Sequence, residues 1–357
     1  MGFNFAAAMT IQTKGQKAVA TWIYIGVGML VVQVILGGIT RLTGSGLSIT
    51  EWNVVTGALP PLNEQQWLEA FGKYKQTPQF QYLNGDFTLH DYKFIFFWEW
   101  FHRNWARLIS VVLLVGFAWF LLKRYLRREM VMPLVVLFLL GALQGAVGWI
   151  MVKSGLTDDM VYVKPLKLAM HFTLALGLIC YAWWFALQLS VPSQQIVRNG
   201  SLRGWTLGII ILLLFQLPYG ALMAGHKAAT AAPTWPTING SWVPGQLFSS
   251  PASLIENKIT VHFIHRGLAY LLLLCTLLWT VNAYRAVTPA LFKKTRWLPF
   301  AMILLQVLLG ITAVLTSPHI VPNRWGLFDW IAQLHQVVGM LFLLTMVFML
   351  YLVRPAK

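Results

Sequence analysis

Apolar residues run through this chain in eight long stretches, and polar or turn-rich segments separate each stretch from the next. A helix needs about 20 predominantly apolar residues to cross the hydrocarbon of a bilayer, and each stretch has roughly that length. The pattern therefore predicts an all-α integral membrane protein. Its eight expected transmembrane helices are residues 18–39, 95–122, 131–152, 167–190, 204–225, 259–283, 297–316 and 331–353.

The composition agrees with a polytopic membrane protein. Of the 357 residues, 57% are hydrophobic and 11% are charged, whereas a soluble domain carries about 25% charged residues. The net charge of +16 raises the question of nucleic acid. Because the basic residues gather in short loops between apolar stretches, as membrane topology requires, we exclude nucleic acid as a partner and expect membrane lipid instead.

The distribution of basic residues predicts the orientation. One side of the expected bundle holds 14 of them on short segments: Lys14, Lys17, Lys123, Arg124, Arg127, Arg128, Arg198, Arg203, Arg285, Lys293, Lys294, Arg296, Arg354 and Lys357. This side is predicted to be cytoplasmic and to carry both termini. The N-terminal residues match neither a cleavable signal nor a transit peptide, which favours a bacterial inner membrane.

The opposite side carries the long loops 40–94 and 226–258, which mix aromatic residues with Gly and Pro. We expect these loops to fold over the outer mouth of the bundle. Within the first loop, residues 64–75 have the spacing of a short amphipathic helix.

Four intramembrane histidines recur at equivalent places, namely His102, His171, His265 and His335. Each follows an apolar stretch that carries Gln-x-x-x-Gly, at Gln33/Gly37, Gln144/Gly148, Gln216/Gly220 and Gln306/Gly310. The first and third histidines are 163 residues apart, and the second and fourth are 164 apart. This period predicts two parallel copies of a four-helix unit, residues 1–190 and 200–357, forming two pseudo-symmetric four-helix bundles.

Ionisable groups inside a bilayer are costly and usually functional. Two imidazoles on different helices are able to ligate one haem iron from both faces. We therefore pair His102 with His171, and His265 with His335, as axial ligands of two haems near the outer, periplasmic side. The alternative is that a membrane histidine only bonds a neighbouring helix, and four equivalent positions make this the weaker interpretation.

Other histidines and the cysteines have simpler interpretations. His90, His226 and His319 fall in the outer loops, where solvated or interfacial roles are expected. Cys180 and Cys275 lie within apolar stretches and are interpreted as small buried hydrophobes, not as a disulfide or metal-cluster pair.

The two copies differ one turn before the first histidine of each. Glu99 precedes His102 on one helix face, whereas His262 precedes His265. The lone carboxylate suggests that one half performs chemistry while the other holds a cofactor. Glu99 is the candidate catalytic residue, through proton transfer or through stabilisation of positive charge. The alternative is an interfacial Glu paired with Arg103 or another cation, and the role of His262 stays open.

Arginines follow the first histidine of each copy. Arg103 and Arg266 are candidates for contacts to haem propionates, which arginine binds in bidentate geometry. Arg107 lies one turn beyond Arg103. The alternative for these arginines is snorkelling to the interface. For Gln-x-x-x-Gly, close helix packing at the glycine is the favoured interpretation. The alternative is that the glycine admits a flat macrocycle and the glutamine forms a hydrogen bond within the bundle.

Several of these segments together resemble a known family. The run from Gly37 to Trp52, the Leu-Pro-Pro-Leu at 59–62 and the Trp-Glu-Trp-Phe-His-Arg at 98–103 carry the resemblance. It continues through His171, the His-Arg at 265–266 and the His-Gln at 335–336. Over essentially its whole length the chain resembles the haem A synthase family, in particular its mitochondrial and proteobacterial branch.

The resemblance implies an oxidoreductase that oxidises the C8 methyl group of haem O to a formyl group, giving haem A for cytochrome c oxidase. It places haem O between His102 and His171 near Glu99, and an electron-passing haem b between His265 and His335. An iron with two histidine ligands has no open position, so either a ligand moves, or water attacks after electron removal, or activation occurs elsewhere. The cysteine pairs that some relatives carry in outer loops are absent here.

Haem O synthase and cytochrome oxidase assembly factors are the partners that the resemblance suggests. A homo-oligomer and the identity of the electron donor are left open. Two other functions stay in consideration: a di-haem b electron-transfer protein of the membrane, and a haem transporter or chaperone.

Overall fold

The computed structural model describes residues 14–53, 56–157, 159–245 and 247–355. Within these residues, eight helical segments are long and apolar enough to cross a membrane, which confirms the predicted number. They are α1 (Lys14–Leu42), α4 (Leu89–Leu122), α5 (Arg128–Lys153), α6 (Pro165–Ser190), α7 (Gly200–Gly225), α9 (Lys258–Arg285), the segment Ala290–His319, and α12 (Leu327–Leu352). The segment Ala290–His319 consists of α10 (Ala290–Thr295), α11 (Leu298–Thr316) and the 3-10 turn η5 (Ser317–His319).

Several helices extend beyond the predicted apolar stretches, and a polar side chain caps the first turn of α4, α7 and α9. The clearest case is α4, which begins at Leu89 and not at residue 95. The side chain of Thr88 accepts a hydrogen bond from the backbone N–H of Asp91, and the Asp91 carboxylate accepts one from Thr88 in return, a capping box. His90, which was expected in a loop, therefore lies in the first turn of α4. That expectation was wrong.

The outer loops contain short helices. The first loop holds the 3-10 turns η1 (Ser45–Leu47) and η2 (Thr56–Ala58), followed by α2 (Glu64–Lys75) and α3 (Pro78–Leu83). Helix α2 confirms the amphipathic segment predicted at 64–75, and Phe71 and Tyr74 of its buried face stack on Tyr92 of α4. The second loop holds η4 (Ala228–Ala231) and α8 (Ser253–Glu256).

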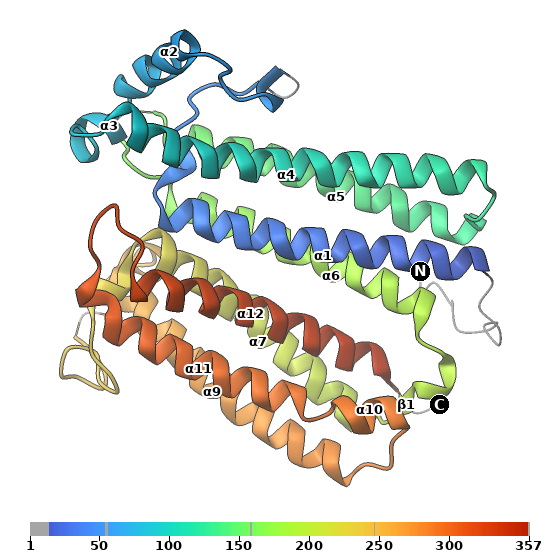
Figure 1. Cartoon of the computed structure of the whole chain (residues 1–357). Coiled ribbons are helices and arrows are strands. Elements are labelled where there is room, and N and C mark those ends of the chain that lie inside the picture. Colours follow the sequence, from blue (N-terminus) through green and yellow to red (C-terminus); the bar gives the residue numbers. More distant parts are fainter. Residues whose placement is uncertain (1–13, 54–55, 158, 246, 356–357) are drawn as a thin grey trace.

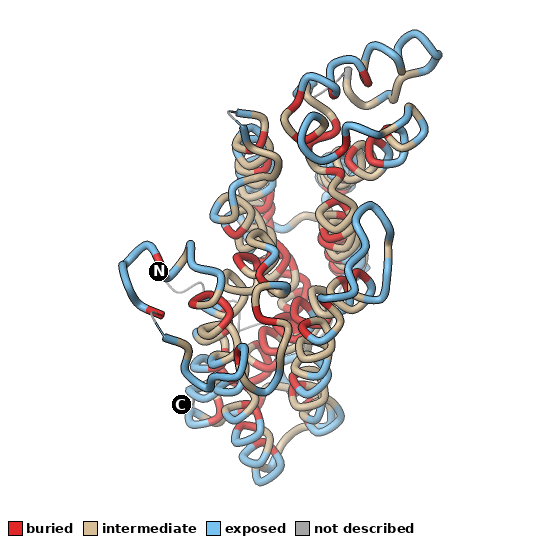
Figure 2. The backbone as a smooth tube through the Cα atoms, turned by 90° about the vertical axis from the view of Figure 1, so that its left-hand side faces the viewer, coloured by how far each residue is buried: buried red, intermediate tan, exposed pale blue. Residues whose placement is uncertain are grey.

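The helices form two groups that share a central seam (Figure 1). In the first group α1 packs against α4 and α6, and α5 packs against α6. In the second group α7 packs against α9 and α12, and α11 packs against α9 and α12. The groups meet where α6 contacts α7 and α12, and where α1 contacts α12. Buried residues concentrate along this central region in Figure 2.

Helix α12 is the most buried of the spanning helices, since 56% of the residues in its most apolar 18-residue segment are buried inside the protein. Lipid solvates apolar side chains as well as protein does, so close packing and interhelical hydrogen bonds hold such a seam together. The packing here includes Ile179 and Leu187 of α6 and Met340 and Met346 of α12, all fully or almost fully buried. The seam is thus a protein core, whereas few residues in the apolar part of α4 are buried.

The linker between the groups is joined to the C-terminal segment at the end of the bundle that the basic residues predict to be the inner one. After the 3-10 turn η3 (Ser193–Gln195), strand β1 (Val197–Arg198) pairs in parallel with β2 (Val353–Arg354). Arg203 Nη1 donates to the carbonyl of Val353 at 2.9 Å. The first residues of α1 and the last residues of α12 lie at this same end (Figure 1). Lys357, one of the basic residues that predicted the orientation, lies outside the described residues.

The contact between α1 and α12 depends on Gly38. Gln333 Nε2 donates to the carbonyl of Ile35 at 3.0 Å, and Gln336 Nε2 donates to that of Val34 at 2.9 Å. A Cβ atom at Gly38 would lie 2.8 Å from Gln336 Nε2, so only glycine leaves room for these two amides.

We expect Gly38→Val to loosen the seam between the two groups. Overpacking of a filled interface typically costs about 1–3 kcal/mol, so the midpoint of thermal unfolding in detergent should fall by several degrees. Gly28→Val is the matched control, because it adds the same β-branched side chain to α1 where a Cβ meets no described atom within 4 Å. Equal unfolding midpoints for the two variants would contradict the role of Gly38.

Candidate haem-binding site

One cavity of about 1460 Å³ runs between the helices and is lined by all four repeated histidines. Sites for a single small molecule usually have about 300–1,000 Å³, so this cavity has room for two large ligands. Residues of both outer loops, among them Trp52, Asn53, Lys227 and Trp235, line its outer part. Both helix groups therefore share one interior space.

Each histidine lies against the glycine of the Gln-x-x-x-Gly motif on the neighbouring helix. A Cβ at Gly37 would lie 3.2 Å from His102 Cε1, which is tighter than ordinary contacts. The other three pairs repeat this arrangement, with corresponding distances of 2.8 Å for Gly148 and His171, 3.2 Å for Gly220 and His265, and 2.9 Å for Gly310 and His335. The glycine thus forms a notch that admits the imidazole.

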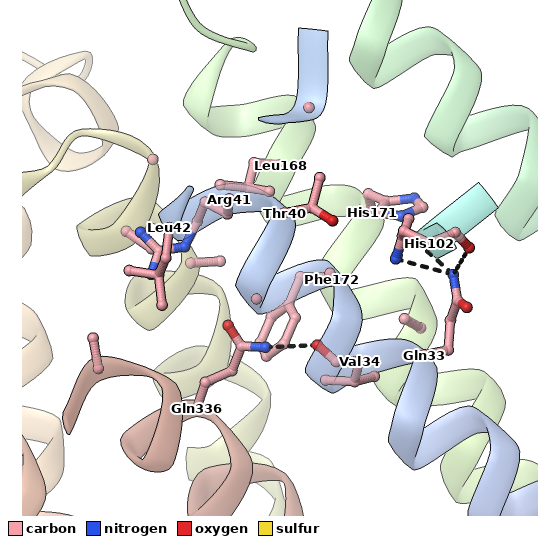
Figure 3. Close-up of a pocket in the computed structure, with 18 of the residues that line it drawn as sticks. Gln33, Val34, Thr40, Arg41, Leu42, His102, Leu168, His171, Phe172 and Gln336 are labelled. Carbon is pink, nitrogen blue, oxygen red and sulfur yellow. Dashed lines mark hydrogen bonds between the residues drawn. The ribbon is translucent and has the colours of Figure 1, made fainter. Parts of the chain in front are cut away.

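The glutamine of the motif contacts the same imidazole in three of the four cases. Gln33 Nε2 lies 3.2 Å from His102 Nε2 and donates to the His102 carbonyl at 3.2 Å (Figure 3). Gln144 makes the equivalent contacts to His171, and Gln306 Nε2 lies 3.3 Å from His335 Nε2. Sequence reasoning had favoured a packing role for this motif. The signal that could have revealed the contact was that the motif recurs on the helix before each of the four histidines.

The histidines come together in the predicted pairs. The rings of His265 and His335 have centroids 6.3 Å apart and are nearly perpendicular. His102 and His171 lie next to each other where α4 and α6 face the cavity (Figure 3). Of the described side chains, Gln33, Gln144, Gln216 and Gln306 each keep a buried Oε1 without a hydrogen-bond partner. Paired imidazoles and glycine notches in a large apolar cavity fit two haems.

Glu99 lines the cavity and is almost completely buried, with 2% of its surface exposed. Its Oε2 accepts hydrogen bonds from Ser48 Oγ at 2.7 Å and from the Ile49 N–H at 2.8 Å. Its Oε1 accepts one from Arg103 Nη2 at 2.5 Å. The carboxylate thus joins the first outer loop to α4 beside His102. Its ion pair with Arg103 is the one that the alternative interpretation of Glu99 predicted.

Both candidate arginines bind outer-loop backbone. Arg103 donates to the carbonyls of Ile49 and Glu51 at 3.2 and 3.0 Å, and its guanidinium lies over the ring of Trp52. Arg266 donates to three carbonyls of the second loop, those of Ala232 at 3.1 Å, Thr234 at 2.7 Å and Thr237 at 3.2 Å. In each half, the arginine after the first histidine therefore fixes the loop above the cavity. Their contact to propionates stays a prediction.

The remaining candidates have varied environments. His262 is fully buried, lines the cavity, and has no hydrogen-bond partner on either ring nitrogen among the described residues. Arg107 donates hydrogen bonds to the side chain of Asn104 and to the carbonyl of Asn53.

The two histidines predicted in the outer loops differ in environment. His226 Nε2 lies 2.7 Å from the Ile255 carbonyl, and His319 is exposed in η5. Sequence reasoning did not single out Arg41, which also lines the cavity.

We expect Arg266→Lys to release the second outer loop, because an ammonium group does not reproduce the forked contacts of a guanidinium. Losing two hydrogen bonds of about 1 kcal/mol each should raise local opening, and hence proteolytic cleavage within 232–257, by about 10-fold or more. Arg285→Lys at the inner end of α9 is the control. Unchanged cleavage in the Arg266 variant would show that the loop is held by other contacts.

Comparisons with known proteins agree with this picture. Residues 20–347 match the family model described as "Cytochrome oxidase assembly protein". A protein of Novosphingobium aromaticivorans named "Heme A synthase" is 43% identical over 342 residues, which cover 91% of each chain. A protein of the same name from Rhodospirillum centenum is 39% identical over 359 residues, or 99% of this chain and 92% of the relative. A third, from Methylobacterium sp., is 39% identical over 93% of this chain and 91% of its own length.

Proposed function

This chain belongs to the haem A synthase family of cytochrome oxidase assembly proteins, and from that membership we propose that it oxidises the C8 methyl group of haem O to the formyl group of haem A. It is accordingly an oxidoreductase of haem biosynthesis in a membrane. The observation that carries the proposal is the pair of facing histidines in each helix group, within one cavity.

We propose that residues 1–190 and 200–357 are two pseudo-symmetric units with different tasks. Matching helix contacts support this, since α1–α4 corresponds to α7–α9 and α5–α6 to α11–α12. The repeated glycine notch and histidine in each unit support it further. His102 and His171 would hold haem O in the first unit, and His265 and His335 would hold haem b in the second.

The residues of the first unit suit methyl oxidation. His102 and His171 would fix the porphyrin, and Gln33 and Gln144 would orient the two imidazoles. Glu99 lies one turn before His102 with both carboxylate oxygens hydrogen-bonded, so it would present a fixed negative charge where positive charge develops on the substrate. The Arg103-anchored loop would keep water from the site.

The second unit would serve electron transfer. A haem b held by His265 and His335 supplies one-electron redox chemistry when bound. Gln306 would set the ring orientation, because its carbonyl lies 3.0 Å from His335 Nδ1. Buried His262 lies one helical turn before His265, and loop-bound Arg266 directly follows it. Arg266 remains a candidate for a propionate contact.

We propose a bacterial inner-membrane location with both termini in the cytoplasm. The basic loops support this, since they gather at the end where α1 begins and α12 ends. The outer loops line the opposite end of the cavity, so the haems would lie toward the periplasm. Haem O synthase and oxidase assembly factors remain the expected partners, with a homo-oligomer and the electron donor unassigned.

Co-expression with haem O synthase tests the function. We expect pigment extracted from the purified protein to contain haem A and haem O, identified by mass, together with haem b. The His102→Ala variant should yield haem b without haem A. Haem b alone in the unaltered protein would favour the di-haem electron-transfer protein, and haem O without any haem A would favour the transporter or chaperone.

A further inference from the structure

The shared cavity reaches deeper into the membrane in the first helix group than in the second. On α1 its lining extends inward to Trp22, whereas on α7 it stops at Leu213, the repeat counterpart of Leu30. Eight residues of helix correspond to about 12 Å of additional depth. On α4 the lining extends to Leu114, but on α9 it stops at Leu272, the counterpart of Ile109. We call this extra space the deep branch.

Two glycines of α5 open the deep branch. Gly141 and Gly145 line the cavity, and a Cβ at either position would meet no described atom within 4 Å. Their repeat counterparts on α11 are Ile303 and Val307, which line the second half of the cavity with branched side chains. The same helix face therefore leaves space in the first half and fills it in the second.

The helices that border the cavity are also packed more closely in the second half than in the first. In the second group α9 and α11 pack directly against each other, while α4 and α5 have no comparable contact over the residues that the structure describes. Near the inner end the rings of Phe117 and Phe138 meet with centroids 5.7 Å apart. There Trp22 also donates its indole N–H to the Val112 carbonyl at 3.1 Å. These contacts lie at the inner end of the branch.

The walls of the branch are apolar. Apart from the glycines, they consist mainly of Ile23, Met29, Leu30, Leu113, Leu114, Leu137 and Phe138. Ser110 also lines it, and its hydroxyl donates to the Ala106 carbonyl of its own helix. Above the branch lie Gln33 and Gln144, whose buried Oε1 atoms have no partner among the described residues. The space is therefore long, apolar and continuous with the His102–His171 site.

We propose that the deep branch holds the isoprenoid tail of haem O. Haem O carries a hydroxyethylfarnesyl chain where haem b carries a vinyl group, so the tail is what distinguishes the two porphyrins. A long apolar branch beside only one histidine pair would direct the tailed haem to the first half and leave the tailless haem for the second. This inference rests on the proposed function and specifies how its substrate is selected.

The test is to give the first half the residues of the second, as Gly141→Ile combined with Gly145→Val. The variant and the unaltered protein are purified after co-expression with haem O synthase, and bound haem O plus haem A is measured relative to haem b. Reconstitution with haem O and with protohaem, which lacks the tail, follows for both. We expect binding of tailed haems to fall by about 10-fold or more, with protohaem binding and the second-half haem b signal unchanged.

Two further variants complete the test. Gly28→Val, on the part of α1 outside the cavity lining, should leave the haem ratio unaltered. Gly141→Ala and Gly145→Ala add a single methyl group to open space, so they should fold and reduce the ratio in smaller, graded steps. If the double variant fails to fold, these graded steps decide the matter.

An unchanged ratio in the folded variants would overturn the proposal, and so would equal losses of haem O and protohaem. Equal affinity of the unaltered protein for both porphyrins would also overturn it and would assign the branch to a lipid acyl chain. A protein that prefers haem O in this way but forms no haem A would refute the proposed reaction and not the tail site.

Discussion

Replacing either His265 or His335 by alanine should abolish the same haem b absorption band. The two rings face each other across 6.3 Å between their centroids, and each lies in a glycine notch of the adjacent helix. The two imidazoles would together hold the iron of one haem, so removing either would take away half of its protein ligands and most of the affinity of the site for haem. We therefore expect near-complete loss of the band in both single variants.

The controls separate loss of a ligand from general damage. His319→Ala removes an exposed histidine of η5 and should leave the spectrum unaltered. His102→Ala should keep the haem b band while losing the tailed haems. Retention of the full band in only one of the His265 and His335 variants would show that these two residues do not form a pair.

Glu99→Gln should lower the yield of haem A by about 100-fold or more while haem b stays bound, because removing a group that stabilises transition-state charge typically has effects of this order. The amide keeps the size of the carboxylate but loses its charge. It also faces three donors, Ser48 Oγ, the Ile49 N–H and Arg103 Nη2, with only one acceptor oxygen, so its NH2 group lies against another donor. Breaking a buried ion pair of this kind typically costs about 3–5 kcal/mol of stability.

Because Glu99 also anchors the first outer loop, a structural effect must be distinguished from a chemical one. Ser48→Ala removes one of the loop hydrogen bonds and keeps the charge, so it should weaken the loop with only a modest loss of haem A. Stability and haem content of both variants are measured alongside the yield. A normal yield in Glu99→Gln would exclude the catalytic role, and equal yields in the two variants would assign Glu99 to loop anchoring.

Much of this architecture is predictable from the sequence because the bilayer imposes simple rules. The eight apolar stretches, the amphipathic segment at 64–75 and the haem A synthase resemblance are confirmed by the helices and by the relatives. Helix ends are harder to predict, because capping groups such as Thr88 and Asp91 extend a helix past its apolar part. For the same reason His90 lies in a helix and not in a loop.

Contacts between segments that are distant along the chain cannot be predicted from this sequence alone. The Gln-x-x-x-Gly spacing is visible along the chain, but its glycine notch exists only after two helices pack. Likewise Arg103 and Arg266 look like free cations beside a histidine, and the path of each loop decides that they bind backbone carbonyls. The assignment of Glu99, the four histidines and the two arginines to particular haem groups stays a prediction.

Helix α1 bears on how this protein could be divided. Its Gly37 accommodates His102 of the first group, while the adjacent Gly38 accommodates Gln333 and Gln336 of the second. One helix therefore completes two sites, and β1 joins β2 beneath both groups. A gene cut between residues 190 and 200 should give two fragments that are insoluble or degraded when expressed singly. They should regain haem only when expressed together, so each half is a folding partner of the other and not a self-sufficient module.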